Sequence, residues 1–252
     1  MKKLVVCDVD GTLLNMNNTV IDRRILELIK TISDKNVFAV SSGRTYGELL
    51  KLFDSVKDRI YFVILDGSAV CYKDRLMFSH PLDNDKIRKF YKLSGKNCTA
   101  VYYGLCNNYL INCGERIAQD KSFIEINSPD EIKEEIYKIS LYGYTAETLE
   151  KTDKYISNNR LFRKIYDNGL WHDYIGICTD KKNGIEYIKN EEEISYNNTY
   201  VFGDNYNDTG LLRCGRGSYV MKNAPMEIKR IAKYEITDIV SELEKIALEG
   251  ME

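Results

Sequence analysis

The chain has 252 residues, which is enough for one large domain or for a core with a modest insert, and either can bury a substantial hydrophobic interior. Its 36 Lys and Arg residues are balanced by 38 Asp and Glu residues, so the net charge of −2 lacks the basic excess typical of proteins that bind nucleic acid phosphates. We therefore expect no nucleic acid partner.

The apolar run over residues 4–7 ends at a charged residue and is too short for a signal peptide or a membrane span. No later apolar run is long enough to span a membrane either. Seven cysteines are scattered without any Cys-x-x-Cys pair, which indicates neither a disulfide framework nor a zinc knuckle. We expect a cytoplasmic protein with no membrane partner, as a monomer or a weak homo-oligomer.

Short apolar runs without polar alternation predict strands that are covered on both faces, as in a parallel sheet. Four such runs lie over residues 4–7, 37–40, 61–65 and 200–202. Each run ends at a small or acidic residue. Apolar residues at helical spacing predict a helix over residues 22–33, between the first two runs. Strand and helix thus alternate, which predicts an α/β fold with a doubly wound, Rossmann-like parallel sheet.

After the first third of the chain, the sequence changes to a pattern typical of antiparallel strands. Aromatic runs over residues 100–103 and 109–112 flank a turn sequence. Runs over 161–166 and 170–177 flank another, Asp167-Asn168-Gly169, which is a hairpin signal. Two β-hairpins are therefore predicted in this part of the chain.

Three helices are predicted in the same part, over residues 84–93, 131–138 and 145–156. The last two begin with Ser or Thr followed by acidic residues, which is a typical start signal. Hairpins and helices together indicate a separate α+β unit. We place this inserted cap domain at residues 83–178 and the core at 1–82 and 179–252.

Asp8 and Asp10 lie two residues apart at the end of the first predicted strand, and Gly11 follows them. In an extended conformation both carboxylates point to the same side. An ionised carboxylate can accept a phosphoryl group once a cation offsets its repulsion from phosphate. Asp10 can protonate a leaving alkoxide and then deprotonate water, and crowding by other carboxylates is expected to raise its pKa. A turn at a strand end is the alternative interpretation, whereas a calcium loop would need further oxygen ligands.

Asp204 and Asp208 form a second acidic pair at another strand end. If a helix begins there, their separation places both on one face. Ligands of open α/β sheets bind beyond the carboxyl ends of the strands, so this pair is expected to face Asp8. An all-oxygen set without His or Cys selects a hard cation such as Mg²⁺. Helix capping is the alternative.

Two further segments offer groups that can hold phosphate. Ser42 and Gly43 follow the second predicted strand and supply a hydroxyl and exposed backbone N–H groups, although a simple capped loop is also possible. Lys181 opens a predicted helix, where its ammonium can neutralise phosphate and aspartate together. Without the other segments it would be an ordinary surface lysine.

In this order, the four segments resemble the four motifs of the haloacid dehalogenase-like superfamily of phosphatases. More narrowly, the chain is similar to the Cof-type branch, which has an α/β cap of the C2/IIB class, and the resemblance spans nearly the whole chain. The segments that match are 8–13, 42–44, 181–185 and 203–208. The ordered set is far more specific than any one of its members.

The resemblance implies a Mg²⁺-dependent phosphatase that hydrolyses a small phosphomonoester, a sugar phosphate or related metabolite, through an aspartyl phosphate. It implies that Asp8 is the nucleophile and Asp10 the acid and base. The implied phosphate-binding residues are Ser42, Gly43, Lys181 and Asn207. The implied metal environment consists of Asp8, Asp10 through its backbone carbonyl, Asp204 and Asp208.

One position departs from the family pattern. Asp66 stands where the family usually has Asn, and a carboxylate suits phosphate less well, so we interpret it as a residue that binds a substrate hydroxyl or the cap linker. His80 and His172 lack a ligand partner at metal spacing in the sequence and are interpreted as structural.

Three other functions fit parts of the sequence. A phosphomutase would use the same aspartyl phosphate and return the group to a second hydroxyl. A non-catalytic binding module could keep the fold, because fold does not fix function. A cysteine-based metal or redox module would use Cys98, Cys106 and Cys113, although their spacing matches no usual ligand pattern.

Overall fold

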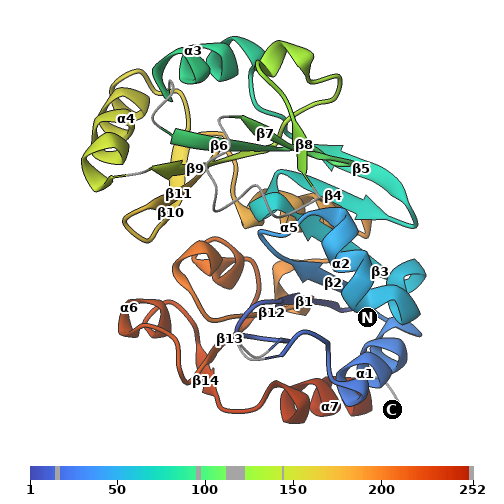
Figure 1. The fold of residues 1–252 in the computed structure, drawn as a ribbon. Coiled ribbons are helices and arrows are strands. Elements are labelled where there is room, and N and C mark those ends of the chain that lie inside the picture. Colours follow the sequence, from blue (N-terminus) through green and yellow to red (C-terminus); the bar gives the residue numbers. More distant parts are fainter. Residues whose placement is uncertain (15–17, 95–97, 112–122, 144, 250–252) are drawn as a thin grey trace. The chain divides into compact units, whose positions relative to one another are not determined.

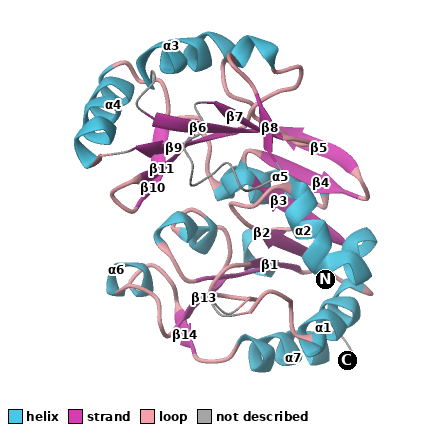
Figure 2. Ribbon diagram, viewed as in Figure 1, coloured by secondary structure: helices cyan, strands magenta, loops and turns pink. Residues whose placement is uncertain are grey.

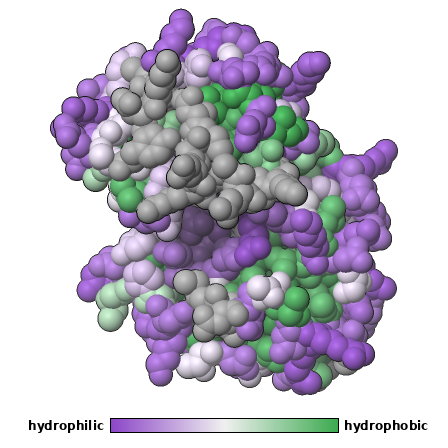
Figure 3. Space-filling model, viewed as in Figure 1, coloured by the Kyte–Doolittle hydropathy of each residue, from purple (hydrophilic) through white to green (hydrophobic). Residues whose placement is uncertain are grey.

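The structure is a computed structural model, and it describes residues 1–14, 18–94, 98–111, 123–143 and 145–249. The chain divides into two compact units, one formed by Met1–Ser79 with Asp180–Glu252 and the other by His80–Thr179. On the face drawn in Figure 3, hydrophilic and hydrophobic residues lie side by side. None of the described helices is both long enough and apolar enough to cross a membrane.

The first unit is built on an eight-stranded sheet, visible in Figure 1 with β1 and β2 near its middle. Its parallel strands, in order across the sheet, are β14 (Tyr234–Ile236), β13 (Gly217–Met221), β12 (Thr199–Gly203), β1 (Leu4–Asp8), β2 (Val37–Ser41) and β3 (Ile60–Ile64). Its antiparallel edge strands are β4 (Ala69–Tyr72) and β5 (Arg75–Ser79). The predicted α/β class with a largely parallel sheet is confirmed.

Helices pack on this sheet because one stripe of each is apolar. They are α1 (Arg23–Ser33), α2 (Tyr46–Phe53), α5 (Lys181–Glu191), α6 (Met226–Lys229) and α7 (Ile239–Glu249). The Asp22 carboxylate caps α1 by accepting from the Arg24 N–H, and Ile25, Ile29 and Ile32 of that helix are buried. Since every residue of β1 is buried, the sheet is covered on both faces at its centre, as the continuous apolar run predicts.

The register of β1 brings several strand ends together. Cys7 lies beside Phe202 of β12, and Asp8 lies beside Ser41 of β2. Because parallel strands end at the same edge of a sheet, Asp8 is flanked there by the residues that follow β2 and β12.

The second unit contains a six-stranded sheet with two helices, α3 (Asn84–Ser94) and α4 (Ala146–Asn158) (Figure 2). In order across the sheet, its strands are β10 (Arg163–Asp167), β11 (Trp171–Ile175), β9 (Lys138–Gly143), β6 (Cys98–Tyr103), β7 (Asn108–Ile111) and β8 (Phe123–Glu125). Both predicted hairpins are confirmed, since β6 pairs with β7 and β10 with β11 in antiparallel fashion; residue 112 of the expected strand lies outside the described residues. Gly169 takes φ +88° in the second turn.

The helix predicted over 131–138 is wrong. The segment forms a single 3-10 turn, Pro129–Glu131, and β9 begins at Lys138. Glu134 explains the difference, because its carboxylate accepts hydrogen bonds from the Cys106 N–H at 3.0 Å, from Asn107 Nδ2 at 2.9 Å and from the Tyr109 hydroxyl at 2.8 Å. These tertiary contacts hold the chain in a non-helical path despite its helical start signal.

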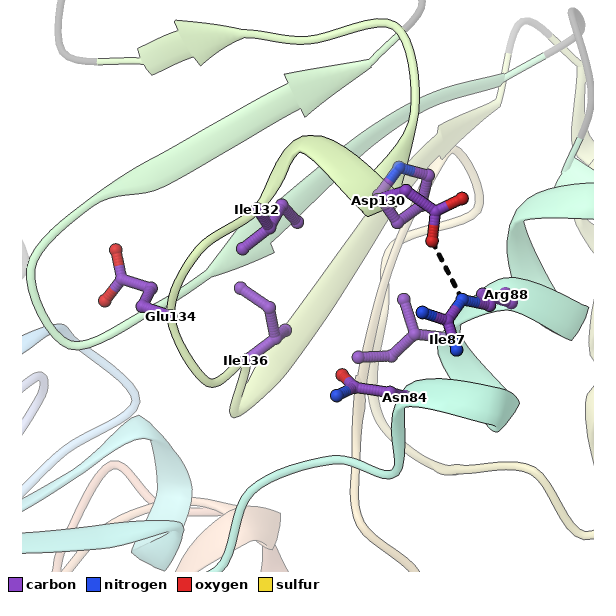
Figure 4. A pocket seen from close by; sticks show the side chains of 8 residues that line it. Asn84, Ile87, Arg88, Asp130, Ile132, Glu134 and Ile136 are labelled. Atoms are coloured by element: carbon purple, nitrogen blue, oxygen red, sulfur yellow. Dashed lines mark hydrogen bonds and ion pairs between the residues drawn. The ribbon is translucent and has the colours of Figure 1, made fainter.

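A small pocket of about 90 Å³ separates this segment from α3 (Figure 4). Ile132 and Ile136 lie on one side of the pocket, and Ile87 lies on the other. Arg88 of α3 closes one end by binding Asp130 at 2.8 Å. The segment is thus attached to α3 by apolar packing and one exposed ion pair, and such pairs contribute little free energy.

Candidate active site

The site begins where β1 ends and α5 starts. The Asp180 side chain caps α5 by accepting from the Lys182 N–H, which places Lys181 in the first turn. Lys181 is 1% exposed, and its Nζ donates to Asp8 Oδ1 at 2.5 Å and to Asp208 Oδ1 at 2.7 Å. Lys181 is thus a buried ammonium with two carboxylate partners. The alternative interpretation, an ordinary surface lysine, is wrong.

Asp208 has two tasks. Its Oδ2 accepts from the backbone N–H groups of Asp204 at 2.9 Å and of Asn205 at 3.0 Å, while Oδ1 binds Lys181. The segment Tyr206–Asp208 is a 3-10 turn, so the regular helix on which the shared face of Asp204 and Asp208 depended does not form here. Asp208 caps the loop and also contacts Lys181, so the capping interpretation is confirmed, and the role of Asp208 as a metal ligand stays a prediction.

Three carboxylates form one acidic cluster. Oxygens of Asp8, Asp204 and Asp208 all lie within 4.8 Å of one another. Burial, followed by the charge of Asp208, raises the pKa of Asp8 well above its usual range. Burial and Asp208 also raise the pKa of Asp204, to about 6. Burial opposes the charge on Lys181, but Asp208 and Asp8 outweigh it and raise the lysine pKa.

This donor set fits a divalent cation. Lys181 contacts two of the three carboxylates, and burial together with the charge of Asp208 raises the pKa values of Asp8 and Asp204. An all-oxygen set of this kind suits a hard ion such as Mg²⁺. The side chain of Asp10 does not join this cluster.

Asp10 pairs with Arg44. Arg44 donates to the two carboxylate oxygens of Asp10, through Nε at 2.9 Å and through Nη2 at 2.6 Å. Ser42 Oγ lies 3.5 Å from Asp10 Oδ2 and accepts from the Arg44 N–H. The expected crowding of Asp10 by carboxylates stays a prediction, and the structure adds Arg44 as a close cationic neighbour. Sequence reasoning missed Arg44, although it directly follows Ser42 and Gly43.

Gly11 allows the two acidic loops to approach closely. Its φ is +94°, and a Cβ at this position would lie 2.2 Å from Asp204 Oδ2. A turn holds this geometry, since the Gly11 N–H donates to the Leu14 carbonyl at 2.8 Å. The buried Thr12 hydroxyl then reaches Asp204 Oδ1 at 3.5 Å, a second residue that sequence reasoning missed.

Asn207 and Gly43 lie next to Asp66. Asn207 Nδ2 donates to Asp66 Oδ1 at 3.2 Å. A Cβ on Gly43 would lie 2.8 Å from Asp66 Oδ2. Asp66 is buried in a left-handed conformation with φ +56°. The role expected for Asp66 toward a substrate hydroxyl or the cap linker stays a prediction.

The remaining candidates lie in the second unit. His172 does have carboxylate neighbours, contrary to expectation: Nδ1 lies 3.2 Å from Asp153 and Nε2 lies 2.9 Å from Asp167. Lys164 binds both carboxylates, and the interpretation of His172 as structural stays a prediction. Cys98 and Cys106 are free thiols, and Cys113 lies outside the described residues.

Comparisons with known proteins extend over the whole chain. Residues 5–244 match the model of the haloacid dehalogenase-like hydrolase family. A Bacillus subtilis protein named 5-amino-6-(5-phospho-D-ribitylamino)uracil phosphatase is 25% identical over 94% of this chain and 90% of its own. A Buchnera aphidicola protein with a provisional phosphatase name is 28% identical over 91% of this chain and 88% of its own.

The fold also matches that of solved structures. A subclass IIB sugar phosphatase superposes with a TM-score of 0.79 at 16% identity, covering 100% of both chains. The family match includes both compact units and all four segments on which the resemblance depends. The resemblance and the enzyme class are thereby confirmed. The chain belongs to the haloacid dehalogenase-like hydrolase family, as a phosphatase.

Proposed function

We propose that the enzyme is a Mg²⁺-dependent phosphatase that hydrolyses a small phosphomonoester through an aspartyl phosphate on Asp8. The observation that carries the proposal is the buried Lys181, which binds Asp8 within a cluster of three carboxylates. Asp8, Asp204 and Asp208 would hold the ion. The resemblance to the family implies the backbone carbonyl of Asp10 as a further ligand. Bound Mg²⁺ would offset the repulsion between these acids and a phosphate dianion.

In the first step an Asp8 oxygen attacks phosphorus, and the bond from phosphorus to the leaving alcohol oxygen breaks. Lys181 binds Asp8 Oδ1, which fixes the orientation of the carboxylate and leaves Oδ2 to attack. Asp10, in its protonated form, gives its proton to the leaving oxygen. Arg44 occupies one lone-pair direction on each carboxylate oxygen, so the remaining lone pairs can carry the proton while the guanidinium holds the carboxyl group in position.

In the second step Asp10 takes a proton from a water molecule, whose oxygen attacks the phosphorus of the aspartyl phosphate. The bond between phosphorus and the Asp8 oxygen then breaks, which releases inorganic phosphate and restores the Asp8 carboxylate. The Ser42 hydroxyl, the Gly43 N–H, Lys181 and Asn207 are proposed to hold the phosphate oxygens in both steps.

The substrate is proposed to be a sugar phosphate or a related metabolite. Two features support this class: the Bacillus subtilis relative is named for a phosphorylated ribityl compound, and the second unit, His80–Thr179, is large enough to act as a cap that selects the substrate. A reducing, cytoplasmic location is also proposed, since all six described cysteines are free thiols.

A panel of phosphorylated metabolites tests the proposal. We expect phosphate release that requires Mg²⁺ and that stops with EDTA. Asp8→Asn should lose turnover by about 10³-fold or more while the protein stays folded, since no other group can accept the phosphoryl group. Retained turnover in Asp8→Asn would exclude the covalent route. Transfer of phosphate to a second hydroxyl without phosphate release would favour the phosphomutase.

A further inference from the structure

The second unit contains a larger cavity, of about 470 Å³, between the end of α4, β10 and the end of β11. Figure 1 shows α4 near these two strands, and α4 contacts β10. Pockets that hold small molecules usually measure about 300–1,000 Å³ and have largely apolar walls with a few placed polar groups. This cavity has the size of such a pocket.

The walls of the cavity are largely apolar. Ile156 of α4, Phe162 and Tyr174 of β11 line it, and all three are otherwise buried, with exposed fractions of 2%, 5% and 0%. Ile177 also lines the cavity and is 42% exposed. An aromatic or aliphatic group in the cavity would remove apolar surface from water chiefly at Ile177.

Three cations line the same cavity: Arg160, Arg163 and Lys164. The one carboxylate among the lining residues, Asp153, is already bound by Lys164 and by the Tyr174 hydroxyl. Among the described residues, no carboxylate forms an ion pair with Arg160. The cavity therefore combines apolar walls with an excess of positive charge.

The backbone at Arg160 is unusual for an arginine. After α4 ends, the Arg160 N–H donates to the Ser157 carbonyl and the chain reverses with φ +47° at Arg160. Helices commonly end with this left-handed conformation, but Gly is the usual residue because a Cβ destabilises it. The chain thus has an arginine where glycine would be more stable, and Arg160 is one of the residues that line the cavity.

The wall beside Arg160 is rigidly held. Lys164 Nζ donates to Asp153 at 2.7 Å and to Asp167 at 2.6 Å. His172, 3% exposed, contacts the same two carboxylates from inside the unit. Because these groups already hold one another, the cavity needs little rearrangement before a ligand enters, which lowers the entropic cost of binding.

We propose that this cavity binds a small amphipathic anion. An aromatic or aliphatic body would pack on Ile177 and on the edge of Phe162, and an acidic group would bind Arg160. None of the lining residues belongs to the candidate active site, so the two sites can be tested separately.

The probe for this test is 8-anilinonaphthalene-1-sulfonate, which has fused rings and one sulfonate and fluoresces when its rings leave water. Its neutral analogue, N-phenyl-1-naphthylamine, lacks the sulfonate. We expect the anion to bind one-to-one and about tenfold more tightly than the neutral compound. Equal affinities would overturn the proposal, and so would displacement of the anion by inorganic phosphate with Mg²⁺, which would place it in the candidate active site.

Arg160→Gly separates binding from folding. Glycine relieves the left-handed strain, so the Tm should rise by roughly 2 to 4 °C. Loss of the guanidinium should nevertheless weaken binding of the anion about tenfold. Weaker binding in a more stable protein cannot come from unfolding. Unchanged affinity in Arg160→Gly would overturn the role of this residue and with it the proposal.

Two further variants test the position of the probe. Ser157→Trp places a large side chain among the lining residues and should block both compounds. Lys151→Gln removes a charge from the same helix at a side chain that is 75% exposed and lies outside the cavity, so its affinity should equal that of the wild type. Full binding by Ser157→Trp, or weakened binding by Lys151→Gln, would contradict the proposal.

Discussion

Lys181 Nζ lies 2.5 Å from Asp8 Oδ1, so the first residue of α5 meets the last residue of β1 in a buried ion pair. The ammonium is the one side-chain cation that contacts the acidic cluster among the described residues. In the absence of a metal ion, the cluster therefore depends on Lys181 for its balance of charge.

Removing this ammonium should strongly destabilise the metal-free protein. Lys181→Met keeps most of the side-chain volume but leaves Asp8 and Asp208 without their cation. We expect the free energy of unfolding at neutral pH to fall by about 3 kcal/mol or more. Urea unfolding measures this loss. Lys182→Met is the matched control, because Lys182 is exposed on the same turn and its replacement should change stability by less than about 0.5 kcal/mol.

Stability of the metal-free protein should depend on pH through Asp204. Its pKa is raised to about 6 by burial and by Asp208, whereas an unfolded aspartate titrates near 4. The folded state therefore binds the proton more tightly, and the free energy of unfolding falls as pH rises from about 4 to about 6. After allowance for partial exposure, this fall should amount to about 1 to 2 kcal/mol.

Asp204→Asn should remove that fall and stabilise the metal-free protein above pH 6. Unfolding in EDTA across the pH range measures the effect, and Asp58→Asn at an exposed carboxyl is the control. The same Asp204 variant should show a smaller rise in Tm on addition of Mg²⁺, because a neutral amide replaces one of the carboxylates proposed to bind the ion. A pH profile equal to that of the wild type would contradict the electrostatic account of the cluster.

Arg44 is expected to position Asp10 for proton transfer. Arg44→Gln removes the two-point contact and should lower kcat by about tenfold, because a mobile carboxyl spends less time at the leaving oxygen. The pair is partly exposed, so folding stability should change by less than about 1 kcal/mol. Steady-state kinetics separates the two effects. Arg59→Gln, which breaks an exposed pair with Asp34, should leave kcat unchanged.

Gly11 should tolerate no side chain. In Gly11→Ala the new Cβ meets the Asp204 carboxylate at 2.2 Å and the residue must hold φ +94°. We expect a loss of about 1 to 3 kcal/mol in stability and a weaker thermal response to Mg²⁺. Gly47→Ala is the opposite case, since Gly47 lies in α2 with no atom within 4 Å of its would-be Cβ. That variant should gain up to about 1 kcal/mol. Equal effects of the two variants would exclude the steric explanation.

Much of the fold could be predicted because its signals are local. The apolar run of β1 and the Asn168-Gly169 turn each report the structure of their own segment. The helix predicted over 131–138 failed because Glu134 binds groups about 25 residues away, and no local pattern encodes such partners.

Within the site, the motifs predicted which residues to consider, but they did not predict how the residues pair. Carboxylates were expected around Asp10, but the two-point contact with Arg44 was not predicted. His172 gained Asp153 from α4 and Asp167 from β10, partners that only tertiary structure brings together. Pairings of this kind depend on which side chains from different segments lie close together in the folded chain. The spacing of residues within one segment does not predict these contacts.

The central strand β1 has consequences for synthesis of the protein. Its neighbour β12 is made nearly two hundred residues later, and Lys181 and Asp208 come equally late. A nascent chain that has completed only β1 to β5 therefore carries Asp8 at an unpaired strand edge, with neither of its buried partners. The buried partners of Asp8 are thus synthesised only after most of the chain has left the ribosome.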